Sequence, residues 1–296
     1  MHAESIHPDT LLGAVALTIS DIHRSVQFYQ DVLGLEIHRR EGRTAYFGAG
    51  AKDLLILVED ASAVQLASRG LRVTGLYHLA ILVPSRLELA RTLRRLVESG
   101  WPLQGFADHG VSEAIYLADP DGNGIEIYRD YPRPQWPSRD GRLQMVTDPL
   151  DVQGVLAELE TDPAPVAIGL HPDTSIGHIH LRVANIQASE DFYCNLLGFD
   201  LVDRFGPSAG FVSAGGYHHH IGFNTWESAG APPPPPGAVG LRYFTVCLPD
   251  SAELARLTAR LQQAGLPLEE TQGGILLHDP ARNAVLLKSN LDRPST

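Results

Sequence analysis

Histidine is unusually frequent in this chain, and its distribution points to metal or proton chemistry. The 296 residues include 13 His and only two Lys. A neutral imidazole is the commonest metal ligand in proteins, and its pKa lies near neutral pH, so it also serves as an acid or a base. Several histidines gather in the middle of the chain: His78, His109, His178, His180 and the run 218–220. If the fold brings them together, they can hold a metal or move a proton.

Internal repeats indicate the elements that would position these side chains. Two helix-like segments occur twice, and so does a turn-rich segment. The repeats are 21–36 with 185–200, 85–103 with 250–268, and 119–127 with 279–287. The chain therefore consists of two similar halves, and each half contains two similar units.

Each unit predicts the element order β-α-β-β-β. It opens with an alternating run such as AVALTIS or YHLAILV, which is typical of a half-buried strand. An amphipathic helix follows, and in the second unit Gly100 stands where that helix would end. Short strands with a turn such as DPDGN between them complete the unit. A strand face that one unit leaves open needs cover from another unit.

Composition limits the classes of function. Hydrophobic residues make up 44% of the chain, enough for ordinary cores, and the net charge is −12 without a basic run. Such a chain is a poor candidate for binding nucleic acid. No apolar stretch approaches the ~18 residues of a membrane span, and the N-terminus lacks a signal-peptide core. Two cysteines are too few for a disulfide framework, so we expect a cytoplasmic protein with reduced thiols. From the charge and the apolar stretches, we expect that it binds neither nucleic acid nor a membrane.

The segment HGVSEAIYLADPDGNGIE is similar to the ring-cleavage signature of extradiol dioxygenases. A histidine is followed by a tyrosine, an Asp-Pro pair, a glycine and a final glutamate. These places are occupied by His109, Tyr116, Asp119, Pro120, Gly122 and Glu126. With its four units, the chain resembles the vicinal oxygen chelate superfamily, which includes glyoxalase I, bleomycin-resistance proteins and type I extradiol dioxygenases. The segments TDPLDV and AGGYHHHIGFNTW resemble its two-domain catechol-2,3-dioxygenase group.

The resemblance implies a fold and an assembly. We expect an α+β protein in which four βαβββ modules form two curved mixed sheets, each built from a pair of modules. Along the chain we expect a first pair of modules at 9–132, a connector at 133–174 and a second pair at 175–291. The resemblance also implies a homo-oligomer.

In this superfamily, metal ligands come from the first and last strands of a unit. The first strands align on the polar residues that end them, and seven residues earlier stand Ala14, His78, His178 and Tyr243. The last strands of units two and four align on their Asp-Pro motifs, which places Glu126 opposite Leu286. Units one and four therefore lack ligands. A triad of two histidines and one carboxylate requires units two and three to pair, and its members are His78, Glu126 and His178.

The implied reaction is the extradiol cleavage of a catechol by O₂. The resemblance assigns Fe(II) to the triad, with Mn(II) as the alternative, and both reactants take the open metal positions. It assigns acid–base catalysis to a histidine on the last strand of unit three. We favour His219 and leave His220 open, because a shift of one residue reverses the face of a strand. His109 and Tyr116 would hydrogen-bond the substrate hydroxyl and the oxygen.

Two other functions stay open. A glyoxalase-like isomerase would take four protein ligands on Zn²⁺ or Ni²⁺, for which the chain offers His78, Glu126, His178 and His220. A metal-free binding or resistance protein would hold a ligand between units. The dioxygenase is favoured because an isomerase does not need His109 and Tyr116, and because a metal-free protein leaves the triad unexplained.

Overall fold

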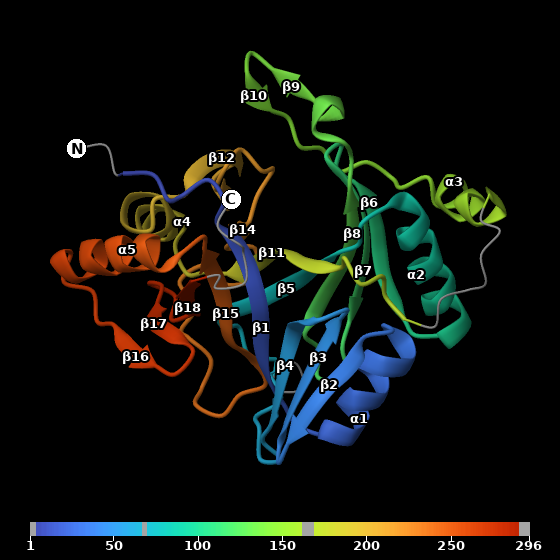
Figure 1. The fold of residues 1–296 in the computed structure, drawn as a ribbon, viewed down its shortest axis with the longest axis horizontal. Helices are drawn as coiled ribbons and strands as arrows, with labels where there is room; N and C mark the ends of the chain where they lie inside the picture. The colour runs from blue at the N-terminus through green and yellow to red at the C-terminus, as the bar shows by residue number, and fades with distance from the viewer. Residues whose placement is uncertain (1–3, 67–69, 162–168, 290–296) are drawn as a thin grey trace.

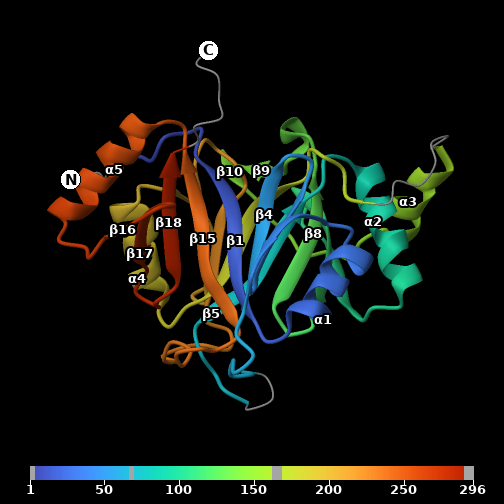
Figure 2. The same ribbon diagram turned by 60° about the horizontal axis from the view of Figure 1, so that its bottom comes forward.

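The computed structural model describes residues 4–66, 70–161 and 169–289, and these residues form two eight-stranded mixed sheets. Figures 1 and 2 show the sheets in the middle of the molecule with helices on its flanks. The predicted α+β fold of four βαβββ modules in two curved mixed sheets is confirmed. The predicted halves, 9–132 and 175–291, each contribute one module to each sheet.

The first sheet contains the strands of modules one and four. From module one they are β1 (Leu11–Ile19), β2 (Glu36–Glu41), β3 (Thr44–Ala49) and β4 (Lys52–Glu59). From module four they are β15 (Gly240–Leu248), β16 (Glu269–Thr271), β17 (Gly274–His278) and β18 (Ala284–Ser289). The strand order is β16-β17-β18-β15-β1-β4-β3-β2. Strands β1 and β15 therefore pair at its centre, and they run antiparallel.

The second sheet contains the strands of modules two and three. From module two they are β5 (Gly75–Leu82), β6 (Leu103–Asp108), β7 (Ser112–Ala118) and β8 (Gly124–Asp130). From module three they are β11 (Ser175–Arg182), β12 (Asp200–Phe205), β13 (Ala209–Ser213) and β14 (Ile221–Asn224). The strand order is β12-β13-β14-β11-β5-β8-β7-β6. The predicted pairing of modules two and three is confirmed, because β5 and β11 pair antiparallel at the centre.

A helix follows the first strand of every module. These elements are α1 (Ile22–Gln27) with the π-helical η1 (Phe28–Val32), α2 (Arg86–Ser99), α4 (Ile186–Glu190) with the π-helical η5 (Asp191–Leu196), and α5 (Ser251–Gln263). The polar residue before each helix accepts a backbone N–H as its N-cap, which satisfies an otherwise unpaired donor. These caps are Asp21, Ser85, Asn185 and Asp250. The four residues that align the units are therefore helix caps, which is why the alignment holds.

A buried hydrogen bond joins the two modules of each half. In the first half the hydroxyl of Tyr29 donates to Oδ2 of Asp119 over 3.0 Å, and in the second half Tyr193 donates to Asp279 over 3.0 Å. Both tyrosines lie in the π-helical segments, which the repeats alone predicted as ordinary helix. The repeated Phe-Tyr and Asp-Pro motifs thus dock the helix of one module on a turn of the next. Figure 1 shows the result, with α1 and α2 on one flank and α4 and α5 on the other.

The connector between the halves has structure of its own. It contains η3 (Arg133–Gln135), the short strands β9 (Ser138–Arg139) and β10 (Arg142–Leu143), α3 (Val152–Ala157) and η4 (Glu158–Thr161). The helix α3 follows Asp148-Pro149 and lies against α2 in Figure 1. In the described part of the chain, no helix has the length and apolar character that crossing a bilayer requires.

Candidate metal centre

Three of the predicted residues meet on neighbouring strands of the second sheet. His78 lies on β5, Glu126 on β8 and His178 on β11, and all three are buried. Nε2 of His78 lies 3.0 Å from Oε2 of Glu126, and Nε2 of His178 lies 3.2 Å from the same oxygen. The three potential ligand atoms all lie within 4.8 Å of one another. These residues, called the metal group below, are the set of His, Cys, Asp or Glu side chains in the described ranges that could hold a metal ion.

The geometry of the metal group fits an ion. Protein nitrogen and oxygen ligands lie about 2.0–2.2 Å from a transition metal, so two ligands at right angles lie about 3 Å apart. Both contacts to Glu126 match that separation. Nε2 of His78 is buried without a hydrogen-bond partner in the described structure, because its contact with Glu126 lacks hydrogen-bond geometry. A metal would satisfy this nitrogen, and two imidazoles with one carboxylate suit Fe(II) with open positions.

The charge state of the metal group also suits an ion. Burial alone would raise the pKa of Glu126, but His178 and His78 outweigh burial and hold that pKa well below its ordinary value. Burial lowers the pKa of His178, against the opposing effect of the Glu126 carboxylate. At neutral pH the group therefore offers a carboxylate and a neutral His178 imidazole, which are the forms that bind metals.

His219 packs against the metal group but does not lie on a strand. The rings of His219 and His178 have centroids 4.1 Å apart. The prediction that the run 218–220 lies on the last strand of module three is wrong, because β14 begins at Ile221. Gly215 and Gly216 both adopt positive φ, which turns the chain before the three histidines. In such a turn, successive side chains need not alternate between two faces as they do in a strand.

A hydrogen-bond relay fixes the protons of His219. Nε2–H of His218 donates to Oδ1 of Asp130 over 2.8 Å. If both rings are neutral, Nδ1 of His218 carries no proton and accepts from Nδ1–H of His219 over 2.9 Å. Nε2 of His219 is then unprotonated. Burial, with the nearby His178 and His218, holds the pKa of His219 well below its ordinary value, so this nitrogen is a neutral base at pH 7.

His220 and His180 have other partners. Nδ1 of His220 accepts the backbone N–H of Ala214 over 3.2 Å, and burial lowers the pKa of His220 to about 3. His220 is not a member of the metal group, so within the described residues the four-ligand set of the isomerase alternative does not form. His180 lies beside His78, with ring centroids 5.0 Å apart, and accepts a hydrogen bond from Asn224 over 3.0 Å. His180 therefore lines the site, whereas His220 supports the turn.

His109 and Tyr116 form a hydrogen-bonded pair beside the metal group. Nδ1–H of His109 donates to the carbonyl of Val146 over 2.8 Å, so Nε2 is left to accept the hydroxyl proton of Tyr116 over 2.7 Å. Tyr116 stands opposite Glu126 in the β7–β8 ladder. Burial, and then the Glu126 carboxylate, raise the pKa of Tyr116 well above its ordinary value, so it keeps its proton. Val146 belongs to the connector between the two halves, so the connector contributes to the surroundings of the metal group.

Sequence reasoning missed the residues behind His219. Besides donating to Asp130, His218 packs against Trp136 of the connector, with ring centroids 5.3 Å apart. The hydroxyl of Tyr217 donates to Oδ2 of Asp130 over 2.9 Å, and Tyr128 donates to the hydroxyl of Tyr217 over 2.8 Å. One signal was available: residues 126, 128 and 130 alternate on one strand and so share a face with the metal group. Their partners in the turn could not be inferred that way.

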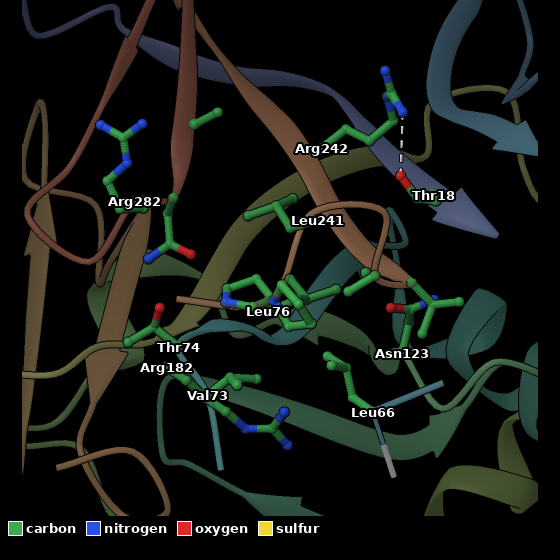
Figure 3. Close-up of a pocket in the computed structure, with 18 of the residues that line it drawn as sticks. Thr18, Leu66, Val73, Thr74, Leu76, Asn123, Arg182, Leu241, Arg242 and Arg282 are labelled. Atoms are coloured by element: carbon green, nitrogen blue, oxygen red, sulfur yellow. Dashed lines mark hydrogen bonds between the residues drawn. The ribbon is translucent and has the colours of Figure 1, made fainter. Parts of the chain in front are cut away.

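A cavity of about 1080 Å³ lies away from the metal group, between the ends of the central strands of both sheets (Figure 3). Its apolar lining includes Leu76 of β5 and Leu241 of β15. Its cationic lining includes Arg182, Arg242 and Arg282. None of the seven residues predicted for the site lines this cavity. We therefore assign it no part in the chemistry of the metal group.

The sequence matches a known family and a curated relative over most of its length. Residues 11–127 and 175–275 match the family described as the Glyoxalase/Bleomycin resistance protein/Dioxygenase superfamily. The chain is 47% identical over 285 residues to catechol-2,3-dioxygenase of Bacillus subtilis (strain 168), with 95% of this chain and 98% of that protein covered. It is 26% identical over 233 residues to metapyrocatechase of Geobacillus stearothermophilus, with 74% and 62% covered.

Solved structures share the fold at low sequence identity. A protein of Bacillus subtilis subsp. subtilis str. 168, provisionally described as a dioxygenase, gives a TM-score of 0.64 at 15% identity and covers 97% of this chain and 87% of its own. Glyoxalase I from Zea mays gives a TM-score of 0.56 at 14% identity and covers 94% and 92%. At these identities the likeness establishes the arrangement of modules and nothing about the reaction.

Proposed function

This chain belongs to the Glyoxalase/Bleomycin resistance protein/Dioxygenase superfamily and is a dioxygenase, and we propose that it opens the ring of a catechol beside its two hydroxyl groups with O₂. The buried metal group of His78, Glu126 and His178 carries the proposal. The Tyr116–His109 pair beside that group adds to it, because an isomerase does not need this pair. The name of the Bacillus subtilis relative supports the substrate class.

We assign Fe(II) to the metal group, with Mn(II) as the alternative. When bound, the metal would bring the catechol oxygens and O₂ into one coordination sphere and pass electron density from the catecholate to O₂. His78, His178 and Glu126 would hold it on one face, and the remaining positions would be free for both reactants. Ala80 and Ala114 form a small buried cluster with Tyr128 on the same face of the sheet, and these side chains would limit the access of water to the group.

Tyr116 and His109 would bind the substrate. Because the Tyr116 proton is directed to Nε2 of His109, the phenolic lone pairs are free to accept a catechol hydroxyl. His109 in turn is fixed by the carbonyl of Val146. The pair therefore orients the substrate without either residue changing its charge.

His219 would act as the base. Its unprotonated Nε2 takes a proton from a catechol hydroxyl, and Nδ1–H continues to donate to His218. The resulting positive charge is stabilised through His218 by the Asp130 carboxylate, as in other imidazoles that a carboxylate orients. The same proton is then available for return to the substrate as its ring opens.

We further propose that the chain forms a homo-oligomer, which the family resemblance implies. Size-exclusion chromatography with light scattering measures the mass in solution. A mass equal to one chain would overturn this part of the proposal.

Metal reconstitution with oxygen uptake tests the reaction. Protein purified without oxygen and loaded with Fe(II) should hold about one metal per chain and consume one O₂ per catechol, because both oxygen atoms enter the opened ring. Parallel samples with Mn(II) decide between the two metals. Protein that binds only Zn²⁺ or Ni²⁺ and leaves catechols untouched would overturn the proposal.

A further inference from the structure

The first sheet has a cavity at the position that corresponds to the metal group. The cavity measures about 790 Å³ and is lined by Ala14, Tyr243 and Leu286, the residues at the three ligand positions of that sheet. We call it the counterpart cavity. Because none of these three side chains is a metal ligand of the kind found in the second sheet, the cavity is free for another use.

Strand register shows that the two positions are equivalent. His178 pairs with Ala80 across the central strands of the second sheet. Tyr243 pairs with Ala16 across the central strands of the first sheet, and it precedes its helix cap by the same number of residues. The counterpart cavity therefore lies at the place in the first sheet that the metal group occupies in the second sheet, with different side chains.

Cations gather at the rim of the counterpart cavity. Lys52 and Lys288 are the two lysines of the whole chain, and both line this cavity. Both side chains are exposed, and neither forms an ion pair within the described residues. Arg39 also lines the cavity, where it binds Asp53, the single carboxylate of the lining, over 2.6 Å. A chain of net charge −12 thus places its lysines together, where they attract anions.

The floor of the counterpart cavity is apolar. Ala14, Ile56 and Leu286 contribute hydrocarbon surface, and the half-buried ring of Tyr243 adds an aromatic surface. Lysine side chains extend their ammonium groups from such surfaces into water. The cavity therefore combines an apolar floor with a cationic rim, which suits a ligand with an apolar body and one negative end.

We propose that the counterpart cavity binds a small organic anion, a carboxylate attached to an aromatic or similarly flat apolar body. The carboxylate binds the ammonium groups of Lys52 and Lys288, and the ring lies on the floor of Ala14, Ile56 and Leu286. Binding involves no bond making and no metal. It is independent of the proposed dioxygenase reaction, which takes place at the other sheet.

Amine footprinting with benzoate as the probe tests this proposal, because the chain has only two lysines. The protein is acetylated with and without benzoate, and mass spectrometry follows each amine. Benzoate should slow the acetylation of Lys52 and Lys288 several-fold, while the α-amino group of the chain serves as an internal control. Benzamide, which has the same shape without the charge, should protect neither lysine. Equal labelling with and without benzoate, or equal protection by benzamide, would overturn the proposal.

Other anions test whether the apolar body is needed for binding, and lysine variants test whether the charge is needed. Acetate and inorganic phosphate carry the charge without the apolar body, so either protecting as well as benzoate would overturn the assigned ligand class. By calorimetry, Lys52→Gln and Lys288→Gln should each weaken benzoate binding by about two- to fivefold, whereas Lys52→Arg and Lys288→Arg should retain it. Unchanged affinity in both Gln variants would place the benzoate elsewhere.

Discussion

The two sheets share one architecture and carry different side chains at equivalent positions. At the three ligand positions the second sheet has His78, Glu126 and His178, and the first sheet has Ala14, Leu286 and Tyr243. The Asp-Pro turns are alike in both halves, since Asp119 and Asp279 each accept two backbone N–H groups. The caps and turns are thus kept where the ligands are absent. These local features therefore form with or without metal ligands beside them.

The two sheets also differ in the cost of burying the side chains at these positions. Glu126 and His178 are each 2% exposed, and burying an ionisable group is unfavourable unless it is paired. At the equivalent place the first sheet carries Leu286, which is buried without that cost. The second sheet therefore keeps its buried charge for chemistry rather than for stability.

The largest contrast is expected between Glu126→Gln and Leu286→Met. The first change removes the charged ligand, so metal affinity should fall by more than about 100-fold, beyond the usual effect of an outer-sphere substitution. The second change should leave metal content as it is. Metal analysis after dialysis measures both variants, with circular dichroism as a check on folding. If Leu286→Met loses metal, the assignment of the first sheet as metal-free is wrong.

A smaller loss is expected from His219→Gln, which removes the proposed base and leaves the metal group intact. Its kcat for catechol should fall about 10²- to 10⁴-fold, the usual range for general acid–base groups, while its metal content should not change. The matched control is His278→Gln, a histidine on β17 of the first sheet, and it should keep the original kcat. Wild-type turnover by His219→Gln would remove His219 from the mechanism.

Asp130→Asn tests the hydrogen-bond relay from His219 through His218 to Asp130, and its expected loss of kcat is smaller than that of His219→Gln. Because the amide no longer stabilises positive charge on His218 and His219, kcat should fall about 10- to 100-fold with metal content unchanged. The acid limb of the pH profile of kcat should shift to lower pH, because without the carboxylate the protonated form of His219 is less favourable and the pKa of the base falls. Tyr217→Phe removes the hydrogen bonds of Tyr217 to Asp130 and Tyr128 but leaves the Asp130 charge in place, so it should have a weaker effect. An effect of Tyr217→Phe equal to that of Asp130→Asn would argue for a packing role instead.

The smallest contrast concerns two glycines that each precede a ligand position. A Cβ at Gly177 would overlap the hydroxyl of Tyr128, which is buried and bonded to Tyr217. A Cβ at Gly13 would lie 2.7 Å from the Sγ of Cys247 and 3.2 Å from the Cβ of Thr245, and both of these neighbours are side chains that can shift by a few tenths of an ångström. Gly177→Ala should therefore destabilise the protein by about 1–3 kcal/mol, and Gly13→Ala by less than about 1 kcal/mol. Denaturant unfolding measures both, and the reverse order would contradict this account of the packing.

Much of the fold and part of the site follow from the sequence. The alternating runs, the caps and the Asp-Pro turns are local features, so they locate strands, helices and turns without knowledge of the rest of the chain. Aligning the units on those features also selected His78, Glu126 and His178 before any distance was known. The π-helical segments could not be predicted, because their extra residue serves the contact of Tyr29 with Asp119 in another module.

The sequence by itself determined the four modules, because these depend on local periodicity and on repeated motifs. The family resemblance, applied to the aligned modules, then implied the pairing of modules two and three and the members of the metal group. Only the tertiary structure shows that His219 packs against His178 while His220 binds the backbone of Ala214, since both stand in a turn whose side-chain directions no periodicity predicts. It alone revealed the bond between His218 and Asp130, which are 88 residues apart, and the contact of His109 with Val146 of the connector. Hydrogen bonds between distant segments depend on how the modules pack against one another, and packing is a property of the whole chain.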